Sequence, residues 1–208
     1  RERVPRGSAR GRLLEAAVTV IRRQGLAATT VDDLCAEAGV TKGAFFHHFS
    51  SKDALAVAAA EHWSEVTGSL FARADYHHAG SAAARVLAYL DLRTELIRGA
   101  PADFSCLVGT MAQEAFATNP AIRRACADSI LGHARTLESD ISQALNDAGR
   151  GGEVDPGGLA RHIQGVIQGA FVLAKAGQDA ELARESIAHL RRYLEHLVTP
   201  GSGQGPAG

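Results

Sequence analysis

Apolar residues recur three and four positions apart through almost the whole chain, and this helical spacing constrains the fold more than any other feature. No segment alternates apolar and polar residues between tight-turn signals, which is the pattern of a half-buried strand. The sequence therefore predicts an all-α protein of about nine helices. The expected helices cover residues 8–24, 31–38, 42–49, 51–74, 81–98, 103–118, 121–148, 156–176 and 180–198.

Turn signals and composition divide these helices into two domains. We expect a three-helix domain over residues 8–52, a larger helical body over 53–198 and a disordered Gly-, Pro- and Ser-rich tail over 199–208. Residues 4–8, VPRGS, resemble a protease-cleavage remnant and do not enter the fold prediction. No apolar run approaches the roughly 18 residues of a membrane span and no signal peptide is visible, so we expect a cytoplasmic protein.

Charge is distributed unevenly between the two domains. Residues 1–52 hold nine Lys and Arg against five Asp and Glu, a net of +4, whereas the remainder carries a net of −5 within the total of −1. A basic first quarter on an acidic remainder indicates that only the N-terminal end meets a polyanion. The alternative is a solvated basic tail, because five of these arginines lie within the first twelve residues.

Residues 30–49, TVDDLCAEAGVTKGAFFHHF, have the layout of two short helices joined by a turn, which is the helix-turn-helix pattern. Thr30 is placed to cap the first helix, and Gly39 to supply the left-handed residue that ends it. Leu34, Ala38, Val40, Phe45 and Phe49 fall where they seal this pair against the preceding helix. The second helix then exposes groups that suit phosphates and base edges, namely Thr41, Lys42, Ala44, Phe46, His47 and His48. The alternative is a generic helical hairpin with core aromatics and solvated histidines.

Residues 12–55 strongly resemble the DNA-binding region of the tetracycline-repressor (TetR/AcrR) family. Residue types and spacing agree over about forty positions rather than at one short pattern. A weaker resemblance extends to a closing helical pair around residues 162–175 and 190–197. The matching elements are Leu14-Glu15-Ala16-Ala17, Gly25, Thr29-Thr30-Val31, Leu34, Ala38-Gly39-Val40-Thr41-Lys42-Gly43, Phe45, His47-His48-Phe49 and Ser51-Lys52-Asp53-Ala54-Leu55.

The resemblance implies a DNA-contacting role for nine residues. Threonine hydroxyls, helix starts and lysines would hold phosphates, and Gly43 would let the backbone approach closely. Ala44 would contact a thymine methyl group. Phe46 departs from the family pattern, which often has a Tyr there, so its polar phosphate anchor is absent and only apolar contact remains. The set is Thr30, Thr41, Lys42, Gly43, Ala44, Phe46, His47, His48 and Lys52.

The resemblance also implies a homodimeric repressor that leaves a palindromic operator when a small molecule binds the C-terminal body. The last two helices would form the dimer interface, with Gly165 and Gly169 permitting close approach; the alternative is that their apolar stripes are only intrachain core. Helix 51–74 would act as a lever between DNA and pocket, and the two recognition helices would lie about 34–36 Å apart. The interface candidates are Ile163, Ile167, Ala170, Leu190 and Leu194.

Aromatic, sulfur-containing and isolated polar residues supply candidates for the effector pocket. Plain core is the competing interpretation for each of them. Glu114 is conspicuous because an acid among apolar neighbours is costly to bury without a partner, so it is either solvated or a ligand group. The candidates are Trp63, Phe71, Phe104, Cys106, Met111, Glu114, His133, His162 and Phe171.

Enzymatic motifs are missing from the sequence. It has no nucleophile elbow, phosphate loop, zinc-ligand cluster or nucleotide fingerprint, so we expect neither an enzyme nor a bound cofactor. Cys35, Cys106 and Cys126 read as buried small hydrophobes, with a reactive thiol as the alternative, and His77-His78 lacks partners at metal-ligand spacing. The remaining competing function is an all-helical interaction module without specific DNA binding. The expected partners are therefore an operator duplex, a small-molecule effector and a second copy of the chain.

Overall fold

A computed structural model describes residues 7–199, and throughout this range the regular structure is helical, with no strand. This confirms the all-α prediction. The expected disorder at residues 200–208 and the first part of the VPRGS segment lie outside the described residues. Between residues 7 and 199, no helix has the length and apolar character needed to cross a bilayer.

The helices gather into two compact units whose bounds differ from the expected division at residue 52. Within the described residues, the first unit comprises residues 7–72 and 105–130, and the second comprises 73–104 and 131–199. The N-terminal helices are therefore completed by a segment that lies far along the chain. The physical reason is burial, because apolar side chains of residues 107–126 share one core with those of residues 13–60.

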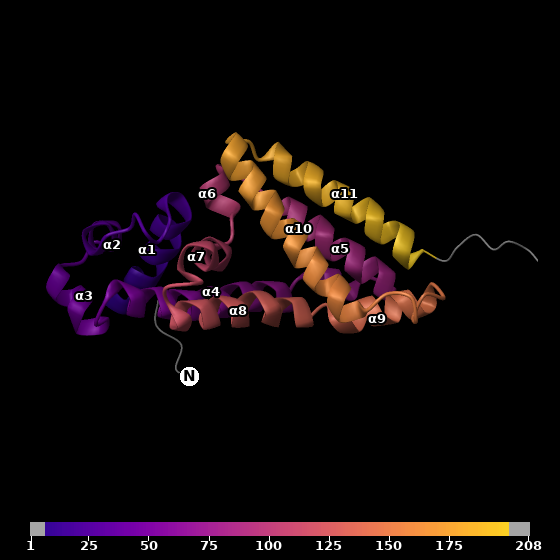
Figure 1. Cartoon of the computed structure of the whole chain (residues 1–208), viewed down its shortest axis with the longest axis horizontal. Coiled ribbons are helices and arrows are strands. Elements are labelled where there is room, and N and C mark those ends of the chain that lie inside the picture. The colour runs from indigo at the N-terminus through magenta and orange to yellow at the C-terminus, as the bar shows by residue number, and fades with distance from the viewer. Residues whose placement is uncertain (1–6, 200–208) are drawn as a thin grey trace, which may run out of the picture. The chain divides into compact units, whose positions relative to one another are not determined.

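The first unit is built around α1, which packs against α2, α3, α4 and α7 (Figure 1). Its core includes Leu13, Leu34, Phe45, Leu55 and Met111, all at most 1% exposed. The core therefore draws a side chain from each of these five helices. The elements are α1 (Ala9–Gln24), α2 (Val31–Ala38), α3 (Lys42–His48), α4 (Lys52–Ala72), α7 (Leu107–Ala115) and the larger part of α8 (Pro120–Arg135).

In the second unit, α10 and α11 pack side by side, and α5 packs against α9 and α11 (Figure 1). Apolar stripes at helical spacing face inward from each helix, as Ile163 and Ile167 do on α10. The elements are η1 (Asp75–His78), α5 (Ala82–Glu95), α6 (Pro101–Phe104), α9 (Glu138–Asp147), α10 (Pro156–Gly177) and α11 (Glu181–Val198), together with the last turn of α8.

Side-chain caps fix the helix starts where the sequence predicts them. The Thr30 hydroxyl accepts from the N–H of Asp33, and the Asp155 carboxylate accepts from the N–H groups of Gly157 and Gly158. Proline stands at the first position of α8 and of α10, where its missing N–H costs nothing. These contacts explain why the predicted bounds agree with the observed ones to within a residue or two at these sites.

Two expected helices are each split in two. Residues 103–118 form α6 and α7, because Cys106 is extended (ψ 122°) and its thiol accepts from the N–H of Gly109, starting a new helix. Residues 121–148 form α8 and α9, because Thr136 and Leu137 bond three residues back rather than four. Apolar spacing continues across both breaks, so periodicity alone did not reveal them.

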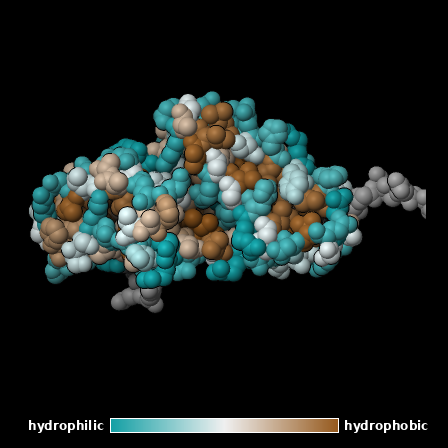
Figure 2. Space-filling view, in the orientation of Figure 1, coloured by the Kyte–Doolittle hydropathy of each residue, from teal (hydrophilic) through white to brown (hydrophobic). Residues whose placement is uncertain are grey.

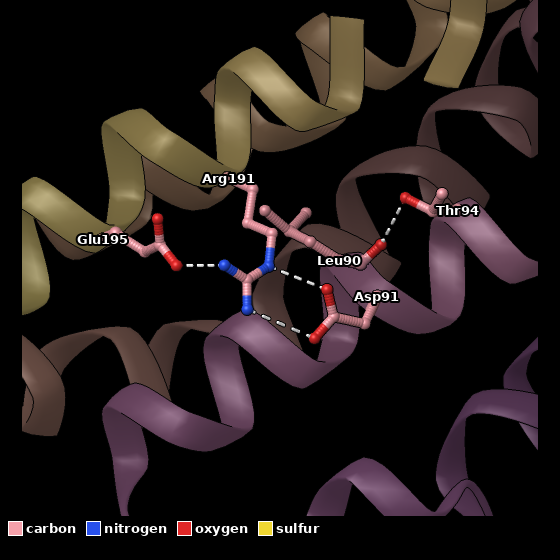
Figure 3. Close-up of polar contacts among 5 residues, drawn as sticks. All are labelled: Leu90, Asp91, Thr94, Arg191 and Glu195. Atoms are coloured by element: carbon pink, nitrogen blue, oxygen red, sulfur yellow. Dashed lines mark hydrogen bonds and ion pairs between the residues drawn. The ribbon is translucent and has the colours of Figure 1, made fainter. Parts of the chain in front are cut away.

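Arg191 of α11 links that helix to α5 (Figure 3). Its guanidinium donates from Nε to Asp91 Oδ1 at 2.8 Å, and it also pairs with Glu195 one turn along α11. The Arg191 and Asp91 side chains are 36% and 52% exposed, so water competes for both charges. Ion pairs of this kind contribute only about 0–1 kcal/mol, so apolar burial between the helices carries most of the stability.

Substitution of Leu194 and of Arg191 on the same face of α11 tests this ranking. Leu194 is fully buried, so Leu194→Ala is expected to lower the free energy of unfolding by about 2–5 kcal/mol, whereas Arg191→Ala should lower it by about 1 kcal/mol or less. Urea denaturation followed by circular dichroism measures both. A larger loss for Arg191→Ala than for Leu194→Ala would contradict the account.

Candidate nucleic-acid interface

The short helix α3 is anchored by one face and exposed on the other. Phe45 is fully buried and Phe49 nearly so, and their ring centroids lie 6.0 Å apart. Thr41 caps the helix by accepting from the N–H of Ala44 at 3.2 Å. Phe46 is 55% exposed, which is unusual for a ring of this size on a short helix. The outward residues are the predicted ones: Thr41, Lys42, Gly43, Phe46 and His47 are exposed, and Ala44 and His48 are partly buried.

The turn before α3 depends on Gly39. This residue ends α2 in the left-handed conformation (φ 61°, ψ 44°), which glycine adopts without the steric cost that a Cβ imposes. Its N–H donates to the carbonyl of Ala36, and the N–H of Val40 donates to that of Cys35 at 3.0 Å. The predicted helix-turn-helix layout is therefore present, with α2 and α3 in contact.

Lys42 is held by an acidic neighbour from α2. Its Nζ lies 2.8 Å from Oδ1 of Asp32, and this hydrogen bond raises the pKa of Lys42 above its ordinary value, so the ammonium stays charged. Both side chains are more than 60% exposed. Since an exposed pair is worth only about 0–1 kcal/mol, an incoming phosphate can replace Asp32 at little cost.

Two predicted phosphate contacts are already engaged within the protein. The backbone N–H of Thr30 donates to Oδ2 of Asp33 at 2.9 Å, which completes a capping box, and the hydroxyl of Thr30 donates to the same oxygen at 2.7 Å. These bonds from Thr30 lower the pKa of the Asp33 carboxyl. The partly buried Lys52 donates from Nζ to the carbonyls of Leu26 and Thr29, at 2.8 and 2.7 Å. The cap at Thr30 was predicted from the sequence, whereas the contacts of Lys52 do not follow from its helical pattern.

The residues predicted to line an effector pocket are divided between the two units. Met111 lies fully inside the core of the first unit, and the Cys106 thiol caps α7. Glu114 is exposed and accepts from the N–H of Ala27 at 2.7 Å, so the solvated alternative applies to it. The first unit holds Trp63, Phe71, Cys106, Met111 and Glu114, and the second holds Phe104, His133, His162 and Phe171.

Within the second unit, His133 belongs to a buried polar chain that sequence reasoning missed. The amide of Gln164 donates to the hydroxyl of Tyr89 at 3.0 Å, and that hydroxyl lies 2.9 Å from Nε2 of His133. Burial lowers the pKa of His133 to about 4, with a further contribution from the Arg93 charge, so the imidazole is neutral at pH 7. A glutamine directly beside Ile163 on an otherwise apolar stripe was the available signal.

Aromatic rings and a small cavity adjoin this chain in the second unit. The guanidinium of Arg93 lies 6.0 Å from the Tyr89 ring and 5.8 Å from the Phe171 ring, and Phe104 lies 5.8 Å from Phe171. The cavity has a volume of about 10 Å³, which holds a single water molecule. Its lining residues are Tyr76, Arg85, Val86, Tyr89, Leu137, Asp140, Ile141 and Ile163.

The five residues predicted for the dimer interface lie in the core of the second unit of this chain. Ile163, Ile167, Ala170, Leu190 and Leu194 are at most 4% exposed, so the intrachain alternative holds for them. The opposite face of α10 is apolar and open instead. Val172 and Leu173 are 47% and 53% exposed there, and hydrophobic surface is visible over α10 in Figure 2. Because α10 is apolar on two faces, helical periodicity alone does not show which face packs inside the chain and which is exposed.

The fold and the exposed face of α3 define a helix-turn-helix DNA-binding protein. Residues 13–59 match the family described as "Bacterial regulatory proteins, tetR family", and residues 82–190 match "Tetracyclin repressor-like, C-terminal domain". The chain therefore belongs to the TetR family of bacterial transcriptional regulators, a family and fold of regulators rather than of enzymes.

Short segments of curated relatives are similar to this chain. An uncharacterized HTH-type transcriptional regulator, YerO, of Bacillus subtilis is 38% identical over 52 residues, which is 25% of this chain and 18% of that protein. The HTH-type transcriptional repressor KstR2 of Mycobacterium tuberculosis is 46% identical over 48 residues, 23% of this chain and 24% of that protein. The matches thus span less than a quarter of each relative's length.

Solved structures resemble this chain over most of its length. A TetR-family regulator of Streptomyces coelicolor, SCO4454, has a TM-score of 0.75 at 24% identity and covers 92% of this chain and 96% of its own. A TetR regulatory protein of Rhodobacter sphaeroides has a TM-score of 0.77 at 22% identity, with 89% and 98% covered. At these identities the likeness establishes the fold alone.

The buried histidine predicts a pH dependence of stability. The folded-state pKa of His133 lies below the unfolded value of about 6.5, so the unfolded chain gains a proton as the pH falls from 6.5 to 4 while the folded chain does not. Wild type should lose about 2–3 kcal/mol more unfolding free energy between pH 7 and pH 4.5 than His133→Gln, whose amide oxygen still accepts from Tyr89. Equal pH profiles from urea denaturation would refute the assignment.

Proposed function

We propose that this protein is a homodimeric repressor that binds a near-palindromic operator and is released when a small molecule binds the second unit. The exposed face of α3 on a fully anchored helix carries the proposal. A cation, an aromatic ring, an imidazole and an open glycine gather there, and these groups suit the phosphates and base edges of a major groove. The name of KstR2, a transcriptional repressor, supports the sign of regulation.

We assign phosphate binding to the start of α3. Lys42 would exchange Asp32 for a phosphate, and the hydroxyl of Thr41 and the N–H of Gly43 would bind beside it. A Cβ at Gly43 would meet nothing nearer than Thr41 Oγ1 at 3.8 Å, so the backbone here is open to a close approach.

The other exposed residues of α3 would contact the bases. Phe46 and Ala44 would contact thymine methyl groups, because neither can donate a hydrogen bond from its side chain. His47 and His48 would bond to a phosphate or a base edge. Their rings lie 4.9 Å apart and nearly perpendicular, so they point to different parts of the duplex.

Salt-dependent DNA binding tests the proposal. The duplex is the DNA flanking the protein's own gene, and wild type is compared with Lys42→Ala. Wild type should bind specifically, and the slope of log K against log salt should become shallower by about 1.8 in the variant, the value for two lost phosphate contacts, one from each protomer.

Lys175→Ala on α10 is the matched control, since it removes the same charge from the second unit and should leave the slope unchanged. Sequence-blind binding, or none at low salt, would contradict the proposal and favour an interaction module without specific DNA binding.

The exposed face of α10 and α11 is the proposed surface for a second copy of the chain. Val172 and Leu173 stand beside Gly165 and Gly169, and a Cβ at either glycine would meet no atom within 4 Å. Tyr193 of α11 continues this face, 46% exposed. Small and apolar side chains on two packed helices suit a four-helix bundle formed by two protomers. Such a dimer also accounts for a palindromic operator.

A charge on this face should break the dimer. Leu173→Glu buries an unpaired carboxylate in the proposed interface and is expected to shift the protein from dimer to monomer at micromolar concentration. Ser139→Glu, an exposed change at the start of α9, should leave the dimer intact. Sedimentation velocity measures both. A wild-type monomer, or a dimeric Leu173→Glu protein, would overturn the assignment of this face.

The effector site is proposed at the polar chain of the second unit. A neutral His133, the Tyr89 hydroxyl and the Gln164 amide offer hydrogen bonds, and Arg93 offers a positive charge between the rings of Tyr89 and Phe171. These groups suit a molecule with an apolar or aromatic body and one hydrogen-bonding or anionic group. The adjoining cavity holds only one water, so such a ligand must displace side chains. That displacement would couple effector to DNA reciprocally, typically by about 1–3 kcal/mol.

A further inference from the structure

The loop between α1 and α2, residues 25–29, is hydrogen-bonded through its backbone to two charged side chains from outside the helix-turn-helix. Glu114 of α7 accepts from the N–H of Ala27 at 2.7 Å. Lys52 of α4 donates to the carbonyls of Leu26 and Thr29, at 2.8 and 2.7 Å. A carboxylate thus accepts a hydrogen bond from one N–H of the loop, and an ammonium group donates to two of its carbonyls. Hydrogen bonds to charged groups are stronger than those between neutral groups.

Gly25 leaves room for the Glu114 carboxylate beside the loop. Its φ of +85° favours glycine, and a Cβ at this position would collide with the Glu114 carboxylate. The carboxylate therefore rests directly against the end of α1. Inside the loop, the hydroxyl of Thr29 donates to the carbonyl of Gly25 at 2.5 Å. The path of the chain between the two helices is set by these contacts.

Loop 25–29 leads directly into the DNA-binding helices α2 and α3. Residue 30, the next in the chain, forms the capping box that starts α2, and α2 packs against α3. A second bond ties the same distant segment to this region, since the Asn119 amide donates to Asp53 Oδ2 at 2.9 Å, beside Lys52. Segment 105–130 thus contacts loop 25–29 and the start of α4 at two polar points, as well as packing through the core.

We infer that Glu114 and Lys52 are positioning residues that fix the orientation of α2 and α3 through loop 25–29, and that Lys52 does not bind a phosphate. The inference rests on the proposed contact of α3 with DNA. The Lys52 ammonium already has two carbonyl partners and lies partly buried, whereas the phosphate-binding Lys42 has a single exposed partner. Through Glu114, segment 105–130 thereby helps to fix the orientation of α2 and α3.

The salt slope separates a positioning residue from a phosphate contact. A lost phosphate contact lowers the slope of log K against log salt by about 0.9, while a misplaced helix lowers affinity at every salt concentration and leaves the slope nearly unchanged. Lys52→Ala and Glu114→Ala are each expected to weaken operator binding roughly ten- to a hundredfold, the range that a lost charge-assisted hydrogen bond implies, at wild-type slope. Lys42→Ala is the comparison that changes the slope.

Rescue and coupling distinguish positioning from general damage. Glu114→Gln keeps an oxygen that accepts from Ala27, so it should retain most of the wild-type affinity. The Lys52→Ala/Glu114→Ala double variant should lose less than the product of the two single losses, because both act on one loop. Stoichiometric titration gives the active fraction of each variant, so that unfolded protein is not counted as weak binding.

Hydrogen exchange at the Ala27 amide supplies a readout that needs no DNA. Exchange should be faster in Glu114→Ala than in wild type and in Glu114→Gln, with the amides of the α1 core unchanged. A Lys52→Ala slope shallower by about 1.8 (0.9 for each protomer), wild-type affinity in Glu114→Ala, or unchanged Ala27 exchange would each overturn the inference. Failure of wild type to bind the operator, with faster Ala27 exchange in Glu114→Ala, would instead contradict the proposed function alone.

Discussion

Burial of the Phe45 ring is the contact on which the DNA-binding surface depends. Helix α3 has seven residues, and a helix this short does not form alone in water. It persists because Phe45 is fully buried in the core of the first unit, with Phe49 beside it and Thr41 capping the start. Once that ring is fixed, the helical repeat turns Lys42, Phe46 and His47 outward. The exposed face is thus a consequence of the buried one.

The first unit is a discontinuous assembly. Its core and its polar contacts both recruit residues 105–130, so the helices that meet DNA are stabilised by a segment that follows the next domain's first helices in the chain. At Phe104 and Ser105 the chain passes from the second unit into the first, and α7 begins at once. The second unit keeps its own polar chain around Tyr89, where burial and the Arg93 charge keep His133 neutral.

Local signals predicted most of the fold, and long-range contacts account for what was missed. Thr30, Gly39 and Pro120 mark their helix ends because caps depend on neighbouring residues only. The bonds of Glu114 to Ala27 and of Tyr89 to His133 join residues 87 and 44 positions apart, and no spacing rule reaches that far. The residues predicted for the dimer interface are buried within the chain for a different reason: α10 is apolar on two faces, and hydrophobicity does not tell which face packs against the same chain. Lys42 lies on the exposed face of α3, as expected, but its ion pair with Asp32 was not predicted, because Asp32 comes from the preceding helix.

The central claim is that two copies of α3 enter successive major grooves on one side of a duplex. A hydroxyl-radical footprint of wild type on the DNA flanking its own gene tests this most directly. The account predicts two protected patches on one face, with centres about 10–10.5 base pairs or a multiple of that apart. A single patch, or uniform weak protection along the duplex, would contradict it.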